Sequence, residues 1–404
     1  MKIRIEKGKA RGKITAPSSK SMAHRLLISA AMSNGVSTVC GISDCEDVAA
    51  TLDCLSALGI KTEKVGNDVT VYGKNFKEVT PIAPLECRES GSTLRFMIPL
   101  AMLSGQTTVF YGASSLMKRP MSVYKKLFSE KGLTYIEDGS SIVVKGRLQG
   151  GEYNIVGNIS SQFISGLIFA LPLADRDSII NIAPPIESRS YINLTINAIA
   201  TFGIKVEWLD EYTLKIPGNQ VYSATNVTVE GDYSGAAFPD SLNLFDGDVE
   251  VLGLNPESIQ GDSVYKRYFD MLRGGAPTIH IGDCPDLGPI LFAVAAAKCG
   301  GVFSGTKRLK IKESDRASAM AEELKKFGTS VSVYEDSVVV YPADFHAPTE
   351  ALSGHNDHRI VMALSILLTL TGGEIDGAEA ISKSYPKFFE DLKKLGVSVT
   401  ECNA

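Results

Sequence analysis

The sequence predicts an α/β fold built from two similar domains, each of three repeated units. A pattern of strand, short loop, amphipathic helix and glycine recurs six times, and a nearly all-apolar helix precedes each copy. The chain of 404 residues also exceeds what one hydrophobic core usually organises. Because the pattern restarts near residues 224–230, we expect a first domain over residues 14–225. The second domain is expected to combine residues 226–404 with residues 1–13, which return to it as a strand.

The amphipathic helices of the six copies each end at a glycine, which adopts the left-handed backbone of a helix C-terminus at little cost. These closing glycines are Gly59, Gly132, Gly203, Gly274, Gly328 and Gly396. Alternating residues around a polar turn follow the first, second, third and fifth copies, as in residues 62–73 and 330–342. This alternation predicts β-hairpins. The fourth copy is weaker and shorter.

The apolar helices that precede the copies are predicted to be buried, because they lack a polar face. Their expected first residues are Ser19, Ser90, Ser160, Asp232, Asp286 and Asn356. Such residues cap the free N–H groups of a helix start, which carries a positive dipole end. If the three helices of each domain point their N-termini at the other domain, the cleft between the domains suits a multiply charged anion.

The composition argues against several classes of protein. With 41 basic and 46 acidic residues the formal charge is −5, which argues against a nucleic-acid or membrane-surface protein. We expect no membrane span, because no apolar run reaches the roughly 18 residues that a span needs. We also expect no signal peptide, because residues 1–5 alternate like a strand. Seven scattered cysteines indicate reduced thiols in the cytoplasm, without disulfides or zinc. His355 and His358 lack a third ligand at suitable spacing, so we expect no metal site.

Cations occupy equivalent points of the repeat, on one predicted end of the domains. They are Lys20, Arg25, Arg95, Arg119, Lys312, Arg316, Arg359 and Lys383. Single charged residues in loops are usually solvated. The side chains of Ser160, Ser161 and Gln162 suit a phosphate or polyol ligand, but they are equally consistent with a plain helix cap. In a chain of negative net charge, however, this alignment favours a cleft in which arginines bind carboxylate or phosphate groups.

Three segments in this order and spacing are similar to the 5-enolpyruvylshikimate-3-phosphate synthase family. They are residues 19–21 with Arg25, residues 312–316 and residues 356–359, and the resemblance extends from Lys2 to the C-terminus. It implies two domains, each of three βαβαββ units around buried helices, in the inside-out barrel of enolpyruvyl transferases. It also implies transfer of the carboxyvinyl group of phosphoenolpyruvate to the 5-hydroxyl of shikimate 3-phosphate, through a tetrahedral intermediate and with release of phosphate.

The resemblance also implies which residues bind the two substrates. Shikimate 3-phosphate would contact Lys20, Ser21, Arg25, Ser160, Ser161, Gln162, Ser188, Tyr191, Asp286 and Lys312. Phosphoenolpyruvate would contact Lys20, Gly91, Arg119, Gln162, Arg316, Arg359 and Lys383. No metal or organic cofactor is implied, and the family likeness suggests a monomer that glyphosate inhibits.

The reaction needs an acid and a base. We expect Asp286 to accept the hydroxyl proton and Glu313 to donate a proton to the methylene carbon. Lys20 and Lys312 would act as electrostatic partners that could share the proton transfer. Two residues depart from the common family pattern, since Glu89 replaces an asparagine and Ser92 a threonine.

Two other functions stay open at this point. The UDP-N-acetylglucosamine enolpyruvyl transferases share the fold, but they carry a cysteine before the Arg-Pro pair that residues 113–120 lack. A non-catalytic anion-binding protein would not need Asp286 and Glu313 among cations. Nucleotide enzymes are disfavoured, because neither phosphate-binding glycine motif occurs.

Overall fold

The computed structural model describes residues 1–402, and the chain forms two compact units. The first unit comprises Lys20–Glu230, and the second combines Met1–Ser19 with the chain from Gly231 onward. Each unit has a hydrophobic core of its own, as expected for independently packed domains.

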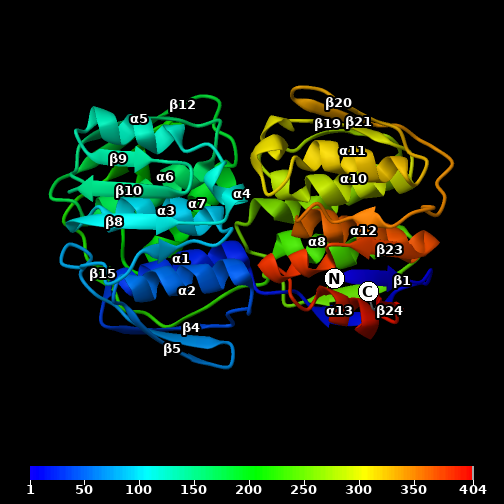
Figure 1. Ribbon diagram of the computed structural model, residues 1–404, viewed down its shortest axis with the longest axis horizontal. Coiled ribbons are helices and arrows are strands. Elements are labelled where there is room, and N and C mark those ends of the chain that lie inside the picture. Colours follow the sequence, from blue (N-terminus) through cyan, green and yellow to red (C-terminus); the bar gives the residue numbers. More distant parts are fainter. Residues whose placement is uncertain (403–404) are drawn as a thin grey trace. The chain divides into compact units, whose positions relative to one another are not determined.

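The first unit contains three four-stranded sheets of the same design (Figure 1). The first sheet has the order β16 (Val227–Thr228), β4 (Val36–Cys40), β6 (Asp68–Tyr72) and β5 (Lys61–Val65). The second has the order β7 (Leu85–Glu86), β8 (Gly105–Tyr111), β10 (Ser141–Gly146) and β9 (Thr134–Glu137). The third has the order β11 (Glu152–Val156), β12 (Ser178–Ala183), β14 (Thr213–Ile216) and β13 (Glu207–Trp208). A small pair joins β3 (Ser33–Asn34) and β15 (Tyr222–Ser223).

Strand pairing is the same in all three sheets. One parallel pair, such as β11 with β12, precedes two antiparallel pairs, of which the last is the predicted hairpin. In the first sheet Val227 lies opposite Val39 in the parallel pair, and Glu63 lies opposite Thr70 in the hairpin. The hairpins predicted after the first, second, third and fifth copies are all present.

Two kinds of helix accompany these sheets, as the apolar patterns predict. The buried helices are α1 (Lys20–Met32), α3 (Gly91–Ala101) and α6 (Ser161–Ala170), which continues as the short turn η1 (Leu171–Leu173). The amphipathic helices are α2 (Glu46–Ala57), α5 (Ser122–Glu130) and α7 (Arg189–Thr201), and α4 (Ser114–Met117) is a single turn. Helix α6 packs against both α3 and α7, and α1 packs against α2 and α7. These contacts bring the helix starts of the unit close together.

The second unit repeats the design with one incomplete copy. Its complete sheets have the orders β18 (Thr278–His280), β19 (Gly301–Ser304), β21 (Ser337–Val340), β20 (Val331–Val333), and β22 (Leu352–Ser353), β23 (Gly373–Asp376), β1 (Lys2–Ile5), β24 (Val399–Cys402). The N-terminal strand β1 thus takes the place of a hairpin strand. The fourth copy contributes only β17 (Asp248–Leu252), which pairs in parallel with β2 (Arg11–Thr15).

The helices of the second unit follow the same division. The buried ones are α8 (Tyr233–Ser241), α10 (Gly288–Ala297) and α12 (His358–Thr371), and the amphipathic ones are α9 (Tyr265–Gly274), α11 (Arg316–Lys325) and α13 (Phe388–Lys394). Short 3-10 turns are η2 (Leu242–Leu244), η3 (Gly261–Val264), η4 (Pro285–Leu287), η5 (Lys307–Ile311) and η6 (Ala378–Lys383). Helices α10 and α12 pack together, and α11 contacts both of them.

Most predicted helix starts are correct, and one is wrong. Ser90, Ser160, Asp232 and Asp357 each cap a buried helix by accepting a backbone N–H, so the sixth start lies one residue after Asn356. Asp286 does not cap a helix, because it lies inside the turn η4 and α10 begins only at Gly288. Its carboxylate is therefore available for other contacts.

The closing glycines behave as predicted in five copies. Gly59, Gly132, Gly203, Gly328 and Gly396 have φ between 69° and 87°. The fourth copy differs, because Gly274 is the last residue of α9 and the following Gly275 has the positive φ of 154°. Two successive glycines let the chain leave this helix one residue later than predicted.

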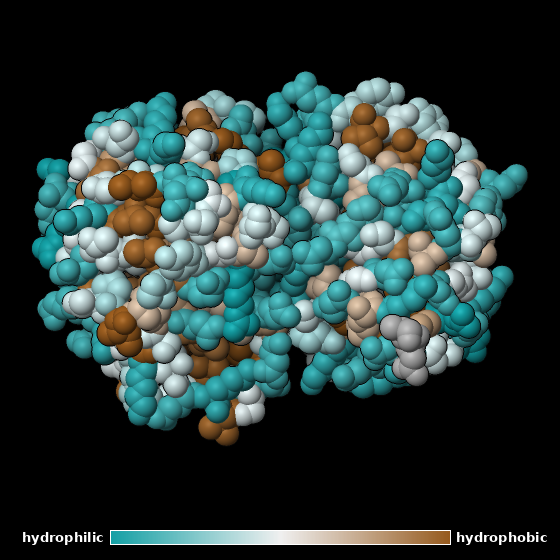
Figure 2. Space-filling view, in the orientation of Figure 1, coloured by the Kyte–Doolittle hydropathy of each residue, from teal (hydrophilic) through white to brown (hydrophobic). Residues whose placement is uncertain are grey.

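The surface is predominantly hydrophilic on the face shown in Figure 2, where hydrophobic residues form small separated groups. Among residues 1–402, no helix has the length and apolar character needed to span a membrane.

Candidate active site

The starts of α3 and α6 bring three predicted phosphoenolpyruvate ligands together in the first unit. Gly91 is the first residue of α3 and Gln162 the second of α6. A Cβ added to Gly91 would lie 3.1 Å from Nη1 of Arg119 and 3.6 Å from Oε1 of Gln162. Only a residue without a side chain leaves space beside these polar groups, which suits the close approach of a small anion.

Arg95 and Ser92 fix the amide of Gln162. Nη1 of Arg95 donates to Oε1 of Gln162 at 2.7 Å, and Nε2 of Gln162 donates to Oγ of Ser92 at 2.8 Å. The hydroxyl of Ser92 therefore retains the acceptor that the common threonine would offer. Arg95 was among the aligned cations of the sequence but was assigned to neither substrate, although its position four residues after Gly91 places both on one helix face.

The residues predicted around the other substrate form a second cluster, centred on Arg25. Its guanidinium donates to the hydroxyl of Thr195 at 2.8 Å and to the backbone oxygens of Ser21 and Tyr191 at 2.7 and 3.0 Å. Burial lowers the pKa of Arg25 to about 10, and no carboxylate of residues 1–402 pairs with it. A buried guanidinium that lacks a carboxylate partner is suited to an anionic ligand. Thr195, one turn after Tyr191, is a contact that the sequence did not reveal.

Three serines of the first unit lie at helix starts. The hydroxyl of Ser160 accepts the N–H of Gln162 at 3.3 Å and so caps α6, whose first residue is Ser161. Ser188 precedes α7 with a left-handed φ of 56°, and its carbonyl accepts the N–H of Tyr191 at 3.0 Å. All three side chains thus flank the N-termini of helices that pack on each other.

Lys20 has an acidic partner that the sequence did not predict. Its Nζ lies 2.8 Å from Oδ2 of Asp47 at the start of α2, and only 13% and 11% of the two side chains are exposed. The pairing compensates in part for a cation at the first residue of a helix. Glu89, which with Ser92 departs from the common family pattern, accepts a hydrogen bond from Ser115 at 2.9 Å.

In the second unit, Arg316 connects three carboxylates. Its Nη1 donates to Oδ1 of Asp286 at 2.7 Å, its Nη2 to Oε2 of Glu313 at 2.9 Å, and its Nε to Oδ2 of Asp357 at 2.8 Å. Burial alone would lower the pKa of Arg316, but Asp357, Glu313 and Asp286 hold it well above its ordinary value. The predicted acid and base are thus joined to one permanent cation. Asp357 belonged to a recognised motif but had received no role.

Lys312 contacts the same carboxylate. Its Nζ donates to Oδ1 of Asp286 at 3.1 Å. Burial lowers the pKa of Lys312, with Arg316 and Arg308 adding to this effect and Asp286 opposing it. The ammonium group is therefore a stronger acid than that of an exposed lysine.

Arg359 and Lys383 complete the predicted residues of the second unit. Arg359 is 3% exposed, and its Nη2 lies 3.6 Å from Oδ2 of Asp286. Its Nε and Nη1 are buried without a hydrogen-bond partner in residues 1–402. Nζ of Lys383 donates to both the backbone and side-chain oxygens of Asn356, at 2.7 and 2.9 Å. The unpartnered nitrogens of Arg359 are costly to bury unless a ligand accepts their hydrogen bonds.

The fold of two repeat-built units and the cationic helix starts define a class of protein, namely enzymes that act on small, multiply charged anions. The carboxylates held among the cations add the means for acid–base chemistry.

The family model of EPSP synthase (3-phosphoshikimate 1-carboxyvinyltransferase) matches residues 5–392, and the chain belongs to this family. It is therefore a transferase of the shikimate pathway, which moves the carboxyvinyl group of phosphoenolpyruvate to shikimate 3-phosphate. The fold class and the function expected from the sequence are confirmed.

Several relatives match nearly the whole chain. The 3-phosphoshikimate 1-carboxyvinyltransferase of Clostridium beijerinckii is 38% identical, with 99% of each chain covered. That of Clostridium acetobutylicum is 40% identical, with 97% of this chain and 96% of the relative covered. A solved EPSP synthase of Acinetobacter baumannii is 24% identical and has a TM-score of 0.79, with 99% of this chain and 100% of that structure covered. At this identity the solved structure demonstrates a shared fold.

Proposed function

We propose that the residues gathered in the two units bind the substrates of this reaction and carry its proton transfers. Phosphoenolpyruvate would contact the cluster of Gly91, Arg119 and Gln162 together with Lys20, Arg316, Arg359 and Lys383. Shikimate 3-phosphate would contact Lys20, Ser21, Arg25, Ser160, Ser161, Gln162, Ser188 and Tyr191 in the first unit, and Asp286 and Lys312 in the second. The observation that carries the proposal is the sharing of Arg316 by Asp286 and Glu313, next to Lys312 and the incompletely paired Arg359.

The proposed addition step includes two proton transfers, one to Asp286 and one from Glu313. The oxygen of the 5-hydroxyl group bonds to C2 of phosphoenolpyruvate, its proton passes to Asp286, and Glu313 in its acid form donates a proton to the methylene carbon C3. The product is a tetrahedral phospho-ketal. In the elimination step a proton returns from C3 to Glu313, the bond from C2 to the phosphate oxygen breaks, and the leaving phosphate takes up the proton held by Asp286. The fixed cations stabilise the charge that develops.

Substrate binding would also prepare Glu313 for its role. In the free protein the contact with Arg316 at 2.9 Å favours the carboxylate form of Glu313. An incoming phosphoenolpyruvate anion competes for Arg316. The carboxylate of Glu313 then loses its cationic partner and takes up a proton more readily. Asp286 keeps Lys312 as a second cationic partner and stays ionised as a base.

Phosphate release tests the proposal directly. Purified protein would be given phosphoenolpyruvate with either shikimate 3-phosphate or UDP-N-acetylglucosamine as acceptor. We expect release with shikimate 3-phosphate alone. Release with the sugar nucleotide would reassign the acceptor, and no release with either would indicate an anion-binding protein without turnover.

Replacing Lys312 by arginine is expected to shift the alkaline limit of activity upward. Because burial lowers the pKa of Lys312, its ammonium is lost at a lower pH than that of an exposed lysine. If this charge is needed, kcat/KM of the wild type falls as the pH rises through that lowered value. Arginine stays charged throughout, so Lys312→Arg should lose this limb while its lower activity reflects imperfect geometry. Identical alkaline limbs in the two pH profiles would remove Lys312 from the mechanism.

Glyphosate is proposed to inhibit in competition with phosphoenolpyruvate, and Gly91→Ala is expected to weaken both ligands. The added methyl group would lie 3.1 and 3.3 Å from the guanidinium groups of Arg119 and Arg95, which must shift. We expect the KM for phosphoenolpyruvate to rise by about 10-fold, an effect of roughly 1.4 kcal/mol. Steady-state kinetics with and without glyphosate would test this, with Gly274→Ala as a control, because a Cβ added to this last residue of helix α9 would meet no atom of residues 1–402 within 4 Å. An unchanged KM and an unchanged inhibition constant would contradict the assignment of Gly91.

We further propose a cytoplasmic monomer. All seven cysteines are unpaired, and the Sγ atoms of Cys54 and Cys87 remain 3.9 Å apart, which is consistent with a reducing compartment. Sedimentation equilibrium should give a mass near the 43.3 kDa of one chain, and a doubled mass would exclude the monomer.

A further inference from the structure

The turn before helix α12 adopts an unusual backbone conformation. His355 and Asn356 have φ of 48° and 52°, so two consecutive residues other than glycine are left-handed. Residues with side chains rarely adopt this region, and they stay there only when the surrounding contacts hold them. The turn is followed directly by Asp357 and Arg359, which belong to the proposed site.

Helix α11 holds this turn at two points. Arg316 at its start contacts Asp357, and Glu323 contacts His355, with 2.9 Å between Oε1 and Nε2. The two helix residues are seven positions apart and therefore lie on one face, two turns from each other. One helix thus fixes both sides of the turn.

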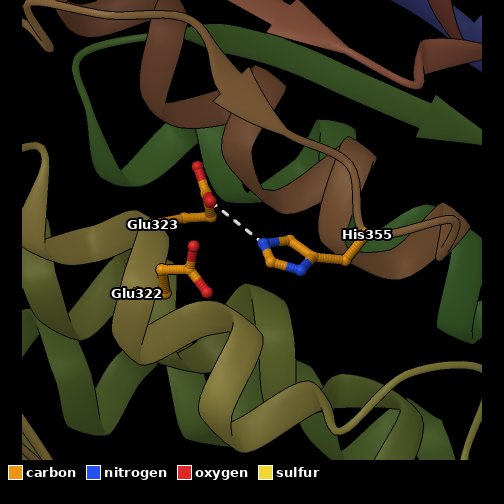
Figure 3. Close-up of side chains that lie close together, drawn as sticks. All are labelled: Glu322, Glu323 and His355. Carbon is orange, nitrogen blue, oxygen red and sulfur yellow. Dashed lines mark hydrogen bonds and ion pairs between the residues drawn. The ribbon is translucent and has the colours of Figure 1, made fainter.

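Glu323 is a fully buried carboxylate whose two oxygens are occupied by N–H groups. Oε2 accepts the backbone N–H of Ser353 at 2.9 Å, and Nζ of Lys326 lies 3.2 Å from Oε1 and 3.1 Å from Oε2. Figure 3 shows the ring of His355 pointing toward Glu323, with Glu322 alongside. The ligand atoms of Glu322, Glu323 and His355 lie within 4.8 Å of one another, as in a metal site. Because N–H donors already satisfy Glu323, an ion-pair network explains the cluster.

We propose that His355, through its bond to Glu323, is a positioning residue for phosphoenolpyruvate. The next residue, Asn356, accepts Nζ of Lys383 through both of its oxygens, and Asp357 accepts the N–H of Arg359 at 2.9 Å. A shift of the turn would therefore move two residues that we assign to this substrate. The inference rests on the proposed function of Lys383 and Arg359.

The bond is expected to depend on pH. The hydrogen bond to Glu323 raises the pKa of His355 against the opposing effect of burial, Glu322 raises it further, and Lys326 lowers it. Lys326 is itself paired with Glu323 and, at 3.6 Å, with Glu350. A histidine whose pKa is raised on folding contributes fully below its ordinary pKa, and the contribution is lost as the pH rises through the raised value.

The test compares His355→Asn with the wild type at about pH 6 and pH 9, on either side of an ordinary histidine pKa. Asparagine tolerates the left-handed backbone but is too short to reach Glu323. We expect the KM for phosphoenolpyruvate to rise about 10-fold at the lower pH, and the ratio of variant to wild type to shrink at the higher pH. The KM for shikimate 3-phosphate should stay within about twofold, and His355→Gln, which keeps a donor, should recover part of the loss. The control is His346→Ala, which replaces an exposed histidine whose Nδ1 lies 2.9 Å from the backbone oxygen of Ala347.

Hydrogen exchange of residues 355–359 provides a readout that does not need turnover. Faster exchange in His355→Asn, but not in His346→Ala, would support the positioning role. Unchanged exchange, or a KM ratio that is near one at both pH values while the wild type releases phosphate, would overturn it. If the wild type releases no phosphate, the proposed function fails, and the inference about substrate positioning fails with it, whatever the exchange data give.

Discussion

Glu313→Gln is expected to lower kcat for carboxyvinyl transfer by about 10²- to 10⁴-fold, the range typical for loss of a general acid. The amide has the shape of the acid and its oxygen can still accept the hydrogen bond that Arg316 donates to Glu313 at 2.9 Å. It cannot deliver a proton to carbon, however. The KM for both substrates should therefore change much less than kcat. Phosphate release at saturating substrate concentrations would measure the effect.

Glu335→Gln provides the matched control for this variant. Glu335 is a glutamate of the same unit, 79% exposed, which forms a surface ion pair with Lys307 at 2.8 Å. Such pairs contribute little to stability, so both stability and kcat should stay close to wild type. If Glu313→Gln kept the kcat of the wild type, the proton donor would have to be Lys312 or Lys20 instead.

The fold was predictable because its periodic features are local. Helix caps such as Ser90 and Ser160, closing glycines such as Gly59, and alternating hairpins such as residues 62–73 each depend on a few neighbouring residues. The errors arose where local signals compete. Asp286 looked like a cap but lies in a 3-10 turn, because Gly288 and Pro289 start the helix after it.

The residues of the candidate site were predictable by type but not by partner. The repeat aligned Lys20, Arg25 and Arg316 at helix starts, which marks them as cations that need compensation. Their partners come from other helices or from distant parts of the chain. Asp47 is 27 residues from Lys20, Asp357 is 41 residues from Arg316, and Thr195 is 170 residues from Arg25. Only tertiary packing brings these pairs together, and no spacing rule in the sequence encodes it.

The ion network of the second unit contributes both to stability and to the proposed chemistry. Arg316 is 1% exposed and contacts Asp357, which is fully buried, as well as the predicted base and acid. This buried cation balances the charge of three neighbouring carboxylates, one of which is fully buried. Its removal should therefore affect folding and catalysis through the same charges.

Arg316→Met is expected to destabilise the protein by about 3–5 kcal/mol and to abolish measurable transfer, because it leaves the buried Asp357 and the partly buried Asp286 and Glu313 without this cation. The methionine fills a similar volume, so the loss reflects charge more than packing. Arg316→Lys should recover only part of the stability, since one ammonium cannot bond three carboxylates in the planar arrangement of a guanidinium. Urea unfolding followed by circular dichroism would measure the differences.

The pH dependence of this loss of stability distinguishes the effect of unpaired charges from that of a general packing defect. In Arg316→Met the carboxylates left without this cation, above all the buried Asp357, should have raised pKa values, so the folded variant loses stability as the pH rises through those values. The gap to the wild type should therefore narrow toward acidic pH, where the carboxylates are neutral. Arg273→Met, which removes an arginine that is 59% exposed and paired with Asp270, should unfold like the wild type at every pH. A gap for Arg316→Met that stays constant with pH would show that the three carboxylates do not depend on this cation.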